Sequence, residues 1–241
     1  MCVIFLAYQQ HSKYPLILLA NRDEFYERPT AKADFWEDSP QVFAGRDLVH
    51  GGTWLGMTNS GRFAAVTNYR DPNAPHGKFS RGDLVSNFLK NDESVEDYLK
   101  KIQSRAADYS GFNLLLGEIN RPNDKIGYYS NRENEIKMLE KGVYGLSNHL
   151  LDTPWRKVQK GKNKLSILLE NDVIKKDSLF EILNDKTLAE DQDLPDTGIG
   201  YEREKLLSAI FIETPIYGTR SSSLILVDKD YQIILDERTY H

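Results

Sequence analysis

Apolar segments of strand length, interrupted by two blocks of helical pattern, are the feature that most constrains the fold of this chain. Short apolar runs occur at 3–8 and 16–20, and the polar stretch QQHSKYP between them predicts a hairpin. Strand-like segments recur along the chain, and the last two, SSSLILV and YQIILDERT, flank the turn DKD. All these runs are too short to cross a bilayer as helices, so we expect no membrane insertion.

The helical patterns begin at recognisable caps. Ser80 and Ser94 are predicted N-caps of the first two helices, and Asp152 or Thr153 is the predicted cap of a third, with Pro154 in its first turn. DSLFEILND and YEREKLLSAIFIE predict two further helices. The order is strands, two helices, strands, three helices, then two strands. Such segregation predicts an α+β fold in which helices cover antiparallel sheets.

The composition is that of a globular protein of 241 residues, with 40% hydrophobic and 28% charged residues. We see no clear linker and predict a single domain over residues 1–241. The net charge of -5 provides no basic field, so we expect no nucleic-acid partner. The start has no pattern of a secretory signal, and we expect a soluble, cytoplasmic protein. Its oligomeric state is open.

The single cysteine stands at position 2, which excludes an intrachain disulfide and a multi-cysteine zinc site. Aminopeptidases generally remove Met1 when the next residue is small. Cys2 would then carry both a thiol and a free α-amine of pKa about 7.7–8.0, so that nucleophile and base share one residue. The alternative is a small strand residue whose thiol has no chemical role.

Polar residues follow several apolar runs. Asn21, Arg22 and Asp23 follow LILLA, and we expect them at the end of a strand, where Asp23 could accept a hydrogen bond from a protonated α-amine. The alternative is a charged turn. Asn68 and Asn148 end two other strand-like runs and could donate to a developing oxyanion, although asparagine is also a common turn residue.

Arg220 precedes the apolar run SSSLILV. An arginine at that place could bind a carboxylate or lower the pKa of a nearby thiol, or it could be a surface cation. The five histidines show no spacing typical of zinc ligands, so we expect no metal site.

Taken together, these segments resemble the NRDE-motif family, also called the transport and Golgi organisation family. The resemblance covers nearly the whole chain: MC at the start, ANRDEFYERPT, FWED, AGRDLVHGGTWLGMTNSGRFAAVTNYRDP, SRGDLVSNFL, YGLSNHLLDTPWRKV, TRSSSLILV and DERTY. That family in turn resembles N-terminal nucleophile hydrolases of the choloylglycine hydrolase and penicillin V acylase kind. The resemblance implies a four-layer αββα sandwich of antiparallel sheets.

The resemblance also implies roles for individual residues. Cys2 would be the nucleophile and Asp23 would bind its amine, while Asn68 and Asn148 would be oxyanion donors and Arg220 would lie beside the thiol. Separately from the resemblance, the polar strand end suits binding of a polar substrate, and we expect Asn21 and Arg22 to contact it.

The chain departs from the hydrolases at one position, because they typically carry an arginine where it has Ala20. Alternation along a strand directs Arg22 to the face opposite Asn21 and Asp23, which predicts fewer positive neighbours for the thiol.

Two functions follow from these residues. The first is hydrolysis of linear C–N amides by Cys2, which needs no cofactor and acts on a small-molecule substrate. The second is non-catalytic binding and trafficking of haem or another hydrophobic small molecule, which the family resemblance implies. Possible axial ligands are His50, His149 and the Cys2 thiolate, and covalent haem attachment is excluded because there is no CxxCH motif.

Overall fold

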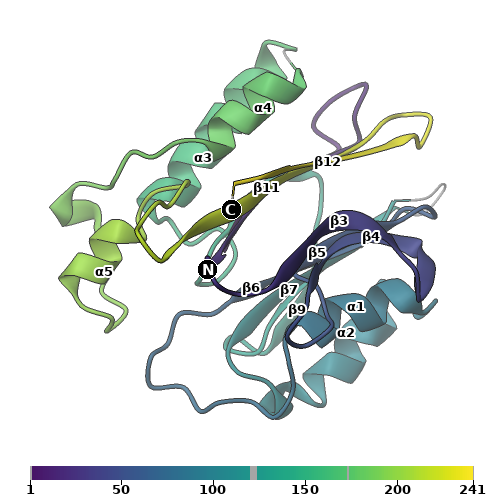
Figure 1. Ribbon diagram of the computed structural model, residues 1–241. Helices are drawn as coiled ribbons and strands as arrows, with labels where there is room; N and C mark the ends of the chain where they lie inside the picture. The colour runs from purple at the N-terminus through teal and green to yellow at the C-terminus, as the bar shows by residue number, and fades with distance from the viewer. Residues whose placement is uncertain (1, 120–123, 173, 241) are drawn as a thin grey trace. The chain divides into compact units, whose positions relative to one another are not determined.

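The computed structural model of the chain describes residues 2–119, 124–172 and 174–240. The chain divides into two compact units, drawn in Figure 1. Unit 1 comprises Met1–Glu27, Arg70–Asn73 and Lys141–His241, and unit 2 comprises Arg28–Tyr69 and Ala74–Glu140. Each unit consists of one antiparallel sheet with helices, so the predicted α+β class is confirmed.

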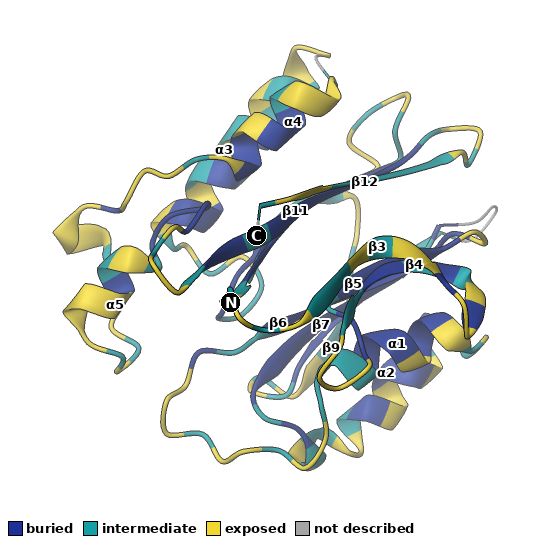
Figure 2. Cartoon of the chain, viewed as in Figure 1, coloured by how far each residue is buried: buried dark blue, intermediate teal, exposed yellow. Residues whose placement is uncertain are grey.

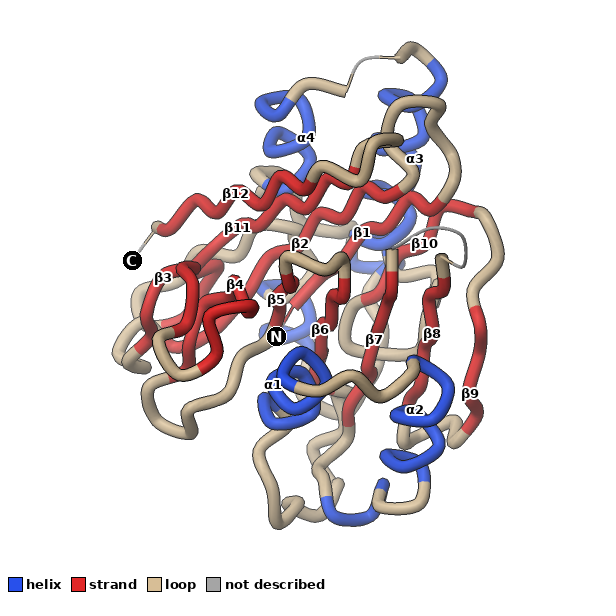
Figure 3. The backbone as a smooth tube through the Cα atoms, turned by 90° about the vertical axis from the view of Figure 1, so that its right-hand side faces the viewer, coloured by secondary structure: helices blue, strands red, loops and turns tan. Residues whose placement is uncertain are grey.

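Unit 1 has a sheet of five strands in the order β10-β1-β2-β11-β12, which can be followed in Figure 3. The strands are β1 (Cys2–Tyr8), β2 (Leu16–Phe25), β10 (Gly142–Leu146), β11 (Tyr217–Val227) and β12 (Ile233–Thr239). Its helices are α3 (Arg156–Glu170), α4 (Lys176–Leu183) and α5 (Tyr201–Leu206), with a single 3-10 turn at Asp191–Asp193. The central strand β2 thus has a partner from the start of the chain and another from near its end.

The predicted hairpin between the first two apolar runs is confirmed by the register of β1 and β2. Cys2 lies opposite Arg22, and Val3 lies opposite Asn21. The prediction that Asn21, Arg22 and Asp23 lie at the end of a strand is confirmed, and the alternative of a charged turn is wrong, because β2 continues to Phe25. The reason is long-range pairing: β11 lies along the whole of β2, so Asn21, Arg22 and Asp23 are buried inside a sheet and Glu24 is half-buried.

The helices α3 and α4 cover one face of this sheet. Their shared core includes Val3 and Phe5 of β1, Leu165 of α3 and Phe180 of α4, all fully buried. Figure 2 shows buried parts of α3 and α4 in dark blue and their exposed parts in yellow. The α3 helix approaches β1 very closely at Gly161, where a Cβ atom would lie 2.0 Å from Phe5 Cζ. Glycine is therefore required at this position for the observed packing.

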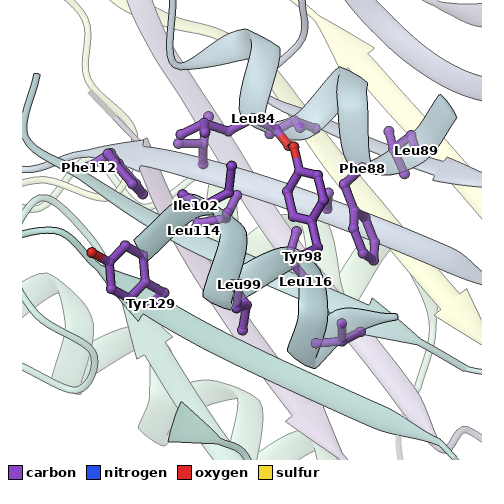
Figure 4. Packing of buried hydrophobic residues seen from close by; sticks show 14 of the residues in the cluster. Leu84, Phe88, Leu89, Tyr98, Leu99, Ile102, Phe112, Leu114, Leu116 and Tyr129 are labelled. Atoms are coloured by element: carbon purple, nitrogen blue, oxygen red, sulfur yellow. The ribbon is translucent and has the colours of Figure 1, made fainter. Parts of the chain in front are cut away.

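Unit 2 has a sheet of seven strands in the order β3-β4-β5-β6-β7-β8-β9. The strands are β3 (Thr30–Trp36), β4 (Ser39–Asp47), β5 (Leu55–Thr58), β6 (Arg62–Asn68), β7 (Phe112–Glu118), β8 (Lys125–Ser130) and β9 (Glu135–Met138). Helices α1 (Gly82–Lys90) and α2 (Val95–Gln103), with a 3-10 turn at Ala106–Asp108, pack on it. Figure 4 shows this core, in which Phe88 and Tyr98 meet edge to face.

The predicted helix starts are only partly confirmed. Ser94 caps α2 by accepting a hydrogen bond from the Asp97 backbone N–H. The Ser80 prediction is wrong, because α1 begins at Gly82 and Ser80 Oγ accepts from the Gly82 N–H, just before the helix. The third cap is also wrong: α3 begins at Arg156, after an extended N-cap residue, Trp155. No helix in the described ranges is long and apolar enough to cross a membrane.

Candidate functional site

Cys2 is the first residue of β1 and lies at one end of the unit 1 sheet. Val3 and Phe5 point into the core beneath α3 and α4, so alternation directs the Cys2 side chain to the opposite face of the sheet. Burial raises the pKa of the thiol above its ordinary value. The Asp23 carboxylate raises this pKa further, whereas the Arg22 charge and the Asp23 backbone N–H lower it.

Arg22 is a positive neighbour of this thiol. As predicted, Arg22 and the pair Asn21 and Asp23 lie on opposite faces of β2. The register pairs Cys2 with Arg22, so Cys2 and Arg22 share one face of the sheet. The inference that alternation would separate Arg22 from the thiol is therefore wrong. The Arg22 side chain is only 6% exposed, and its Nη2 lies 4.0 Å from Glu24 Oε2.

Asp23 is a buried carboxylate, 2% exposed, on the helix-covered face of β2. Its Oδ1 accepts a hydrogen bond from Thr219 Oγ1 at 2.7 Å, and its backbone oxygen accepts one from the Tyr217 hydroxyl at 3.1 Å. Burial raises the pKa of Asp23, and the charge of Lys157 and the Thr219 hydroxyl oppose that rise. Burial likewise raises the pKa of Tyr217, with the charges of Asp23 and Cys2 adding to the effect.

Asn21 uses its amide to hold the fold together. Its Nδ2 donates to the backbone oxygens of Leu183 (2.8 Å) and Ile210 (2.9 Å), and its Oδ1 accepts from Ser222 Oγ at 2.6 Å. These bonds join β2 to the end of α4 and to β11. A contact of Asn21 with substrate stays a prediction.

Asn148 follows β10, which pairs with β1, so that its neighbour Ser147 reaches Cys2. Its role as an oxyanion donor stays a prediction. Ser147 Oγ donates to the Cys2 backbone oxygen at 3.1 Å and lies 3.3 Å from Asn148 Oδ1. The backbone oxygen of Asn148 accepts from the Arg70 N–H at 2.7 Å. The fully buried Asn148 amide is thus held in a fixed position.

The two remaining predicted residues are Asn68 and Arg220. Asn68 is the half-buried last residue of β6 in unit 2, opposite Phe112 of β7. Arg220 is half-buried at the point where the register of β11 and β2 shifts, and its Nη1 donates to the Phe25 backbone oxygen at 2.8 Å. Their catalytic roles stay predictions.

Lys157 is a residue of this region that the sequence interpretation missed. It is only 3% exposed, and its Nζ donates to the Leu207 backbone oxygen at 2.9 Å. Burial lowers its pKa to about 8, against an opposing effect of the Asp23 charge. A signal was present, because Lys157, Gly161 and Leu165 are spaced by four and share the buried face of α3.

Arg70 is a second missed residue. Its guanidinium is ion-paired with Glu204 and lies 4.8 Å from the centre of the Trp155 ring. The sequence gave no indication that this arginine is buried, because Arg70 directly precedes the turn residues Asp71 and Pro72.

The histidines considered as haem ligands lie in different units. His149, in unit 1, has Nδ1 2.9 Å from Thr153 Oγ1 and a ring that packs against Trp155, and burial lowers its pKa. His50, in unit 2, is exposed in a turn. Among the residues described, no group of three or more His, Cys, Asp or Glu side chains is arranged to hold a metal ion. Haem binding stays a prediction.

Comparison with known proteins identifies relatives along the whole length. A Bos taurus protein, "Transport and Golgi organization protein 2 homolog", is 40% identical over 256 residues, covering 99% of this chain and 93% of its own length. The Drosophila melanogaster "Transport and Golgi organization protein 2" is 28% identical over 260 residues, with coverage of 99% and 92%.

Among solved structures, the mutant C2A of conjugated bile acid hydrolase from Clostridium perfringens matches with a TM-score of 0.51 at 11% identity, covering 100% of this chain and 97% of that one. This likeness shows the fold alone and confirms the predicted N-terminal nucleophile hydrolase-like architecture. The family model of Transport and Golgi organisation 2 matches residues 1–241. The chain therefore belongs to the Transport and Golgi organisation 2 family.

Proposed function

We propose that this protein hydrolyses linear C–N amide bonds with Cys2 as an N-terminal nucleophile, after residue 1 has been removed. The observation that carries the proposal is the position of Cys2 at the end of a sheet, opposite the buried Arg22 and hydrogen-bonded to Ser147, the residue before Asn148. The related bile acid hydrolase supports it, because the substitution in that enzyme's name is at a cysteine in position 2.

The chemistry begins with the thiol proton. Because burial raises the pKa of Cys2, the thiol needs a base near neutral pH. A free α-amine on Cys2, with a pKa of about 7.7–8.0, supplies that base within the same residue. The Arg22 charge favours the thiolate, and the Asp23 carboxylate favours the ammonium that forms.

The thiolate attacks the carbonyl carbon of the amide, and the negative charge moves to the carbonyl oxygen. An Asn148 amide donor stabilises this oxyanion without the cost of a buried charge. The C–N bond then breaks, the amine leaves with the proton from the ammonium, and water hydrolyses the thioester left on Cys2.

The test uses protein expressed without an N-terminal tag. We expect an intact mass lower by one methionine and turnover of at least one member of a series of N-acyl 4-nitroanilides with increasing acyl length. Cys2→Ala should abolish release of 4-nitroaniline, and mass spectrometry of a rapid quench should detect an acyl adduct on Cys2 in the parent protein only.

Alanine, like cysteine, is small enough for an aminopeptidase to remove the methionine before it. We therefore expect residue 1 to be removed from the variant as from the parent. Ser104→Ala, at an exposed helix end in unit 2, is the control and should keep full activity. Full activity in Cys2→Ala, or retention of Met1 in the active protein, would refute the proposal.

A further inference from the structure

Lys157 carries a buried ammonium group that forms no ion pair with any side chain in the described ranges. The residue is 3% exposed, and its Nζ donates to the Leu207 backbone oxygen at 2.9 Å. A charge removed from water is costly unless an opposite charge lies near it. The charged form of Lys157 therefore depends on an anion in its surroundings.

Asp23 is the anion that balances this charge. The largest effects of neighbouring charge on Lys157 come from Asp23, Arg70, Cys2 and Glu204. Arg70 and Glu204 form an ion pair with each other, so their effects on Lys157 largely cancel. The Cys2 thiol is neutral near pH 7, because burial raises its pKa. The negative charge that remains near Lys157 is that of Asp23.

The face of α3 that carries Lys157 lies against the strands of the candidate site. Gly161 is one turn further along this face and packs closely on Phe5 of β1, the strand that begins with Cys2. Asp23 lies on the next strand, β2, on the face of the sheet that the helices cover. The ammonium and the carboxylate are thus on the same side of the sheet.

The segment from Leu207 to Ile212 holds both groups in place. At its start the Leu207 backbone oxygen accepts the hydrogen bond from Lys157. At its end the Ile212 N–H donates to Thr219 Oγ1 at 2.9 Å, and this hydroxyl donates to Asp23 Oδ1 at 2.7 Å. Residues 208–212 are all buried. The cation and the carboxylate are therefore fixed by one buried segment of the chain.

The Asp23 carboxylate needs positive charge around it to stay ionised. Burial raises the pKa of Asp23. The Lys157 charge, the hydrogen bond from Thr219 and the Arg22 charge lower it. Tyr217, whose hydroxyl donates to the Asp23 backbone oxygen, adds no charge, because burial raises its pKa. A neutral carboxyl group could not attract the α-ammonium of the proposed nucleophile.

We propose that Lys157 is a positioning residue of the candidate site: its ammonium is the counter-charge that keeps Asp23 ionised inside the fold, so that this carboxylate can hold the α-ammonium of Cys2. Lys157 acts through Asp23 and not on the substrate. Its effect on catalysis rests on the proposed hydrolysis, whereas the coupling of the two charges does not.

The test is ¹³C NMR titration of carboxyl-labelled Asp23 in the full chain. Lys157→Met should reduce the acid dissociation constant of Asp23 about 10-fold, since the carboxylate loses an opposite charge. Lys157→Arg keeps the charge and should restore the titration of the parent. Lys162→Met, at a partly exposed position of the same helix, is the control and should leave Asp23 unchanged. An Asp23 titration that is unchanged in folded Lys157→Met protein would overturn the proposal.

The coupling is reciprocal, so it can also be measured from the side of Asp23. Asp23→Asn keeps the shape of the side chain and should raise the acid dissociation constant of Lys157 by the same factor of about 10, read from its ¹⁵Nζ resonance. This experiment leaves Lys157 in place and is informative where Lys157→Met does not fold. An unchanged Lys157 titration in folded Asp23→Asn protein would likewise contradict the proposal.

An activity assay separates the role of Lys157 from the hydrolysis on which it rests. Where the parent hydrolyses N-acyl 4-nitroanilides, Lys157→Met should lower kcat/KM about 10-fold at pH 7 and move the acidic limb of the pH profile to higher pH, with rescue by Lys157→Arg. An unchanged profile would overturn the role of Lys157 and leave Cys2 as the nucleophile. A parent without hydrolytic activity, but with coupled titration of Asp23 and Lys157, would support the charge coupling and refute the hydrolysis alone.

Discussion

The reactivity of Cys2 is set by a balance between burial and two neighbouring charges. Burial and Asp23 raise the pKa of the thiol, whereas Arg22 lowers it. We expect iodoacetamide to modify Cys2 slowly at pH 7 in the folded chain and faster as the pH rises above 9. Because Cys2 is the single cysteine, intact mass reports its modification without ambiguity.

Arg22→Met should shift this pH profile upwards, since the thiolate loses one positive neighbour. Arg105→Met is the matched control, because that arginine is exposed and lies in unit 2. An unchanged profile in folded Arg22→Met protein would show that Arg22 has no electrostatic effect on the thiol.

Lys157 should make stability depend on pH in the opposite sense to an ordinary surface lysine. Its pKa is lowered to about 8 by burial, from an ordinary value of 10.5. Between these two values the unfolded chain binds more protons than the folded one, so the Lys157 contribution to the free energy of unfolding rises with pH. The shift corresponds to at most about 3 kcal/mol.

The measurement is urea unfolding of the parent and of Lys157→Met at several pH values from 7 to 10.5. The stability of the parent relative to the variant should rise over this range, most steeply above pH 8. Lys162→Met, at a partly exposed position of the same helix, should show no such trend. A constant difference between parent and Lys157→Met would refute the prediction.

The residues of the candidate site differ in how well the sequence alone predicts them. Cys2, Asp23 and Asn148 could be predicted because they stand at recognisable places in the chain. Lys157 and Arg70 could not be predicted as easily, because a lysine or arginine is usually exposed and only tertiary packing shows that these two are buried.

The contact between α3 and β1 depends on a glycine. At Gly161 an added Cβ would meet the Phe5 ring at 2.0 Å, so Gly161→Ala should displace the helix. We expect the free energy of unfolding to fall by about 1–3 kcal/mol, as for other overpacked cores, despite the better helix propensity of alanine. Urea denaturation measures this loss.

Asn163→Ala is the control on the exposed side of the same helix and should be neutral or slightly stabilising. Adding Phe5→Leu to Gly161→Ala should recover part of the loss, because the shorter side chain makes room. Strict additivity of the two substitutions would argue against the contact as the cause.

At this scale the sequence predicted the main hairpins and the order of helices and strands. It did not reveal β3 and β4, whose residues include many polar and exposed positions. It left open whether the polar NRDE segment continues the second strand or forms a charged turn, because the answer depends on pairing with the distant strand β11.

The NRDE segment of β2 is hydrogen-bonded to β11, a strand from near the other end of the chain. Asn21 is bonded to Ser222, and Asp23 to Thr219, so that β2 is buried only when β11 is present. A chain truncated after Ile216 should therefore leave Cys2 open to solvent. We expect iodoacetamide at pH 8 to modify it at the rate of the urea-unfolded full chain, at least 10-fold faster than in the folded full chain.

Protection of Cys2 in the truncated chain, measured by the same intact-mass assay, would show that β11 is not required. The full chain in buffer and in urea sets the two limits of the assay. Pairing across so many residues is also expected to make folding slow, because the entropy of closing long loops precedes the gain from contacts.

The position of β2 between an early and a late strand has a consequence for biosynthesis. Asp23 leaves the ribosome 196 residues before its partner Thr219, an interval of about 10–40 seconds at about 5–20 residues per second. The native surroundings of Cys2 cannot form during that interval. If Cys2 is the nucleophile proposed above, an aminopeptidase would remove residue 1 from a nascent chain that is still open, and maturation would precede the folding that encloses Cys2.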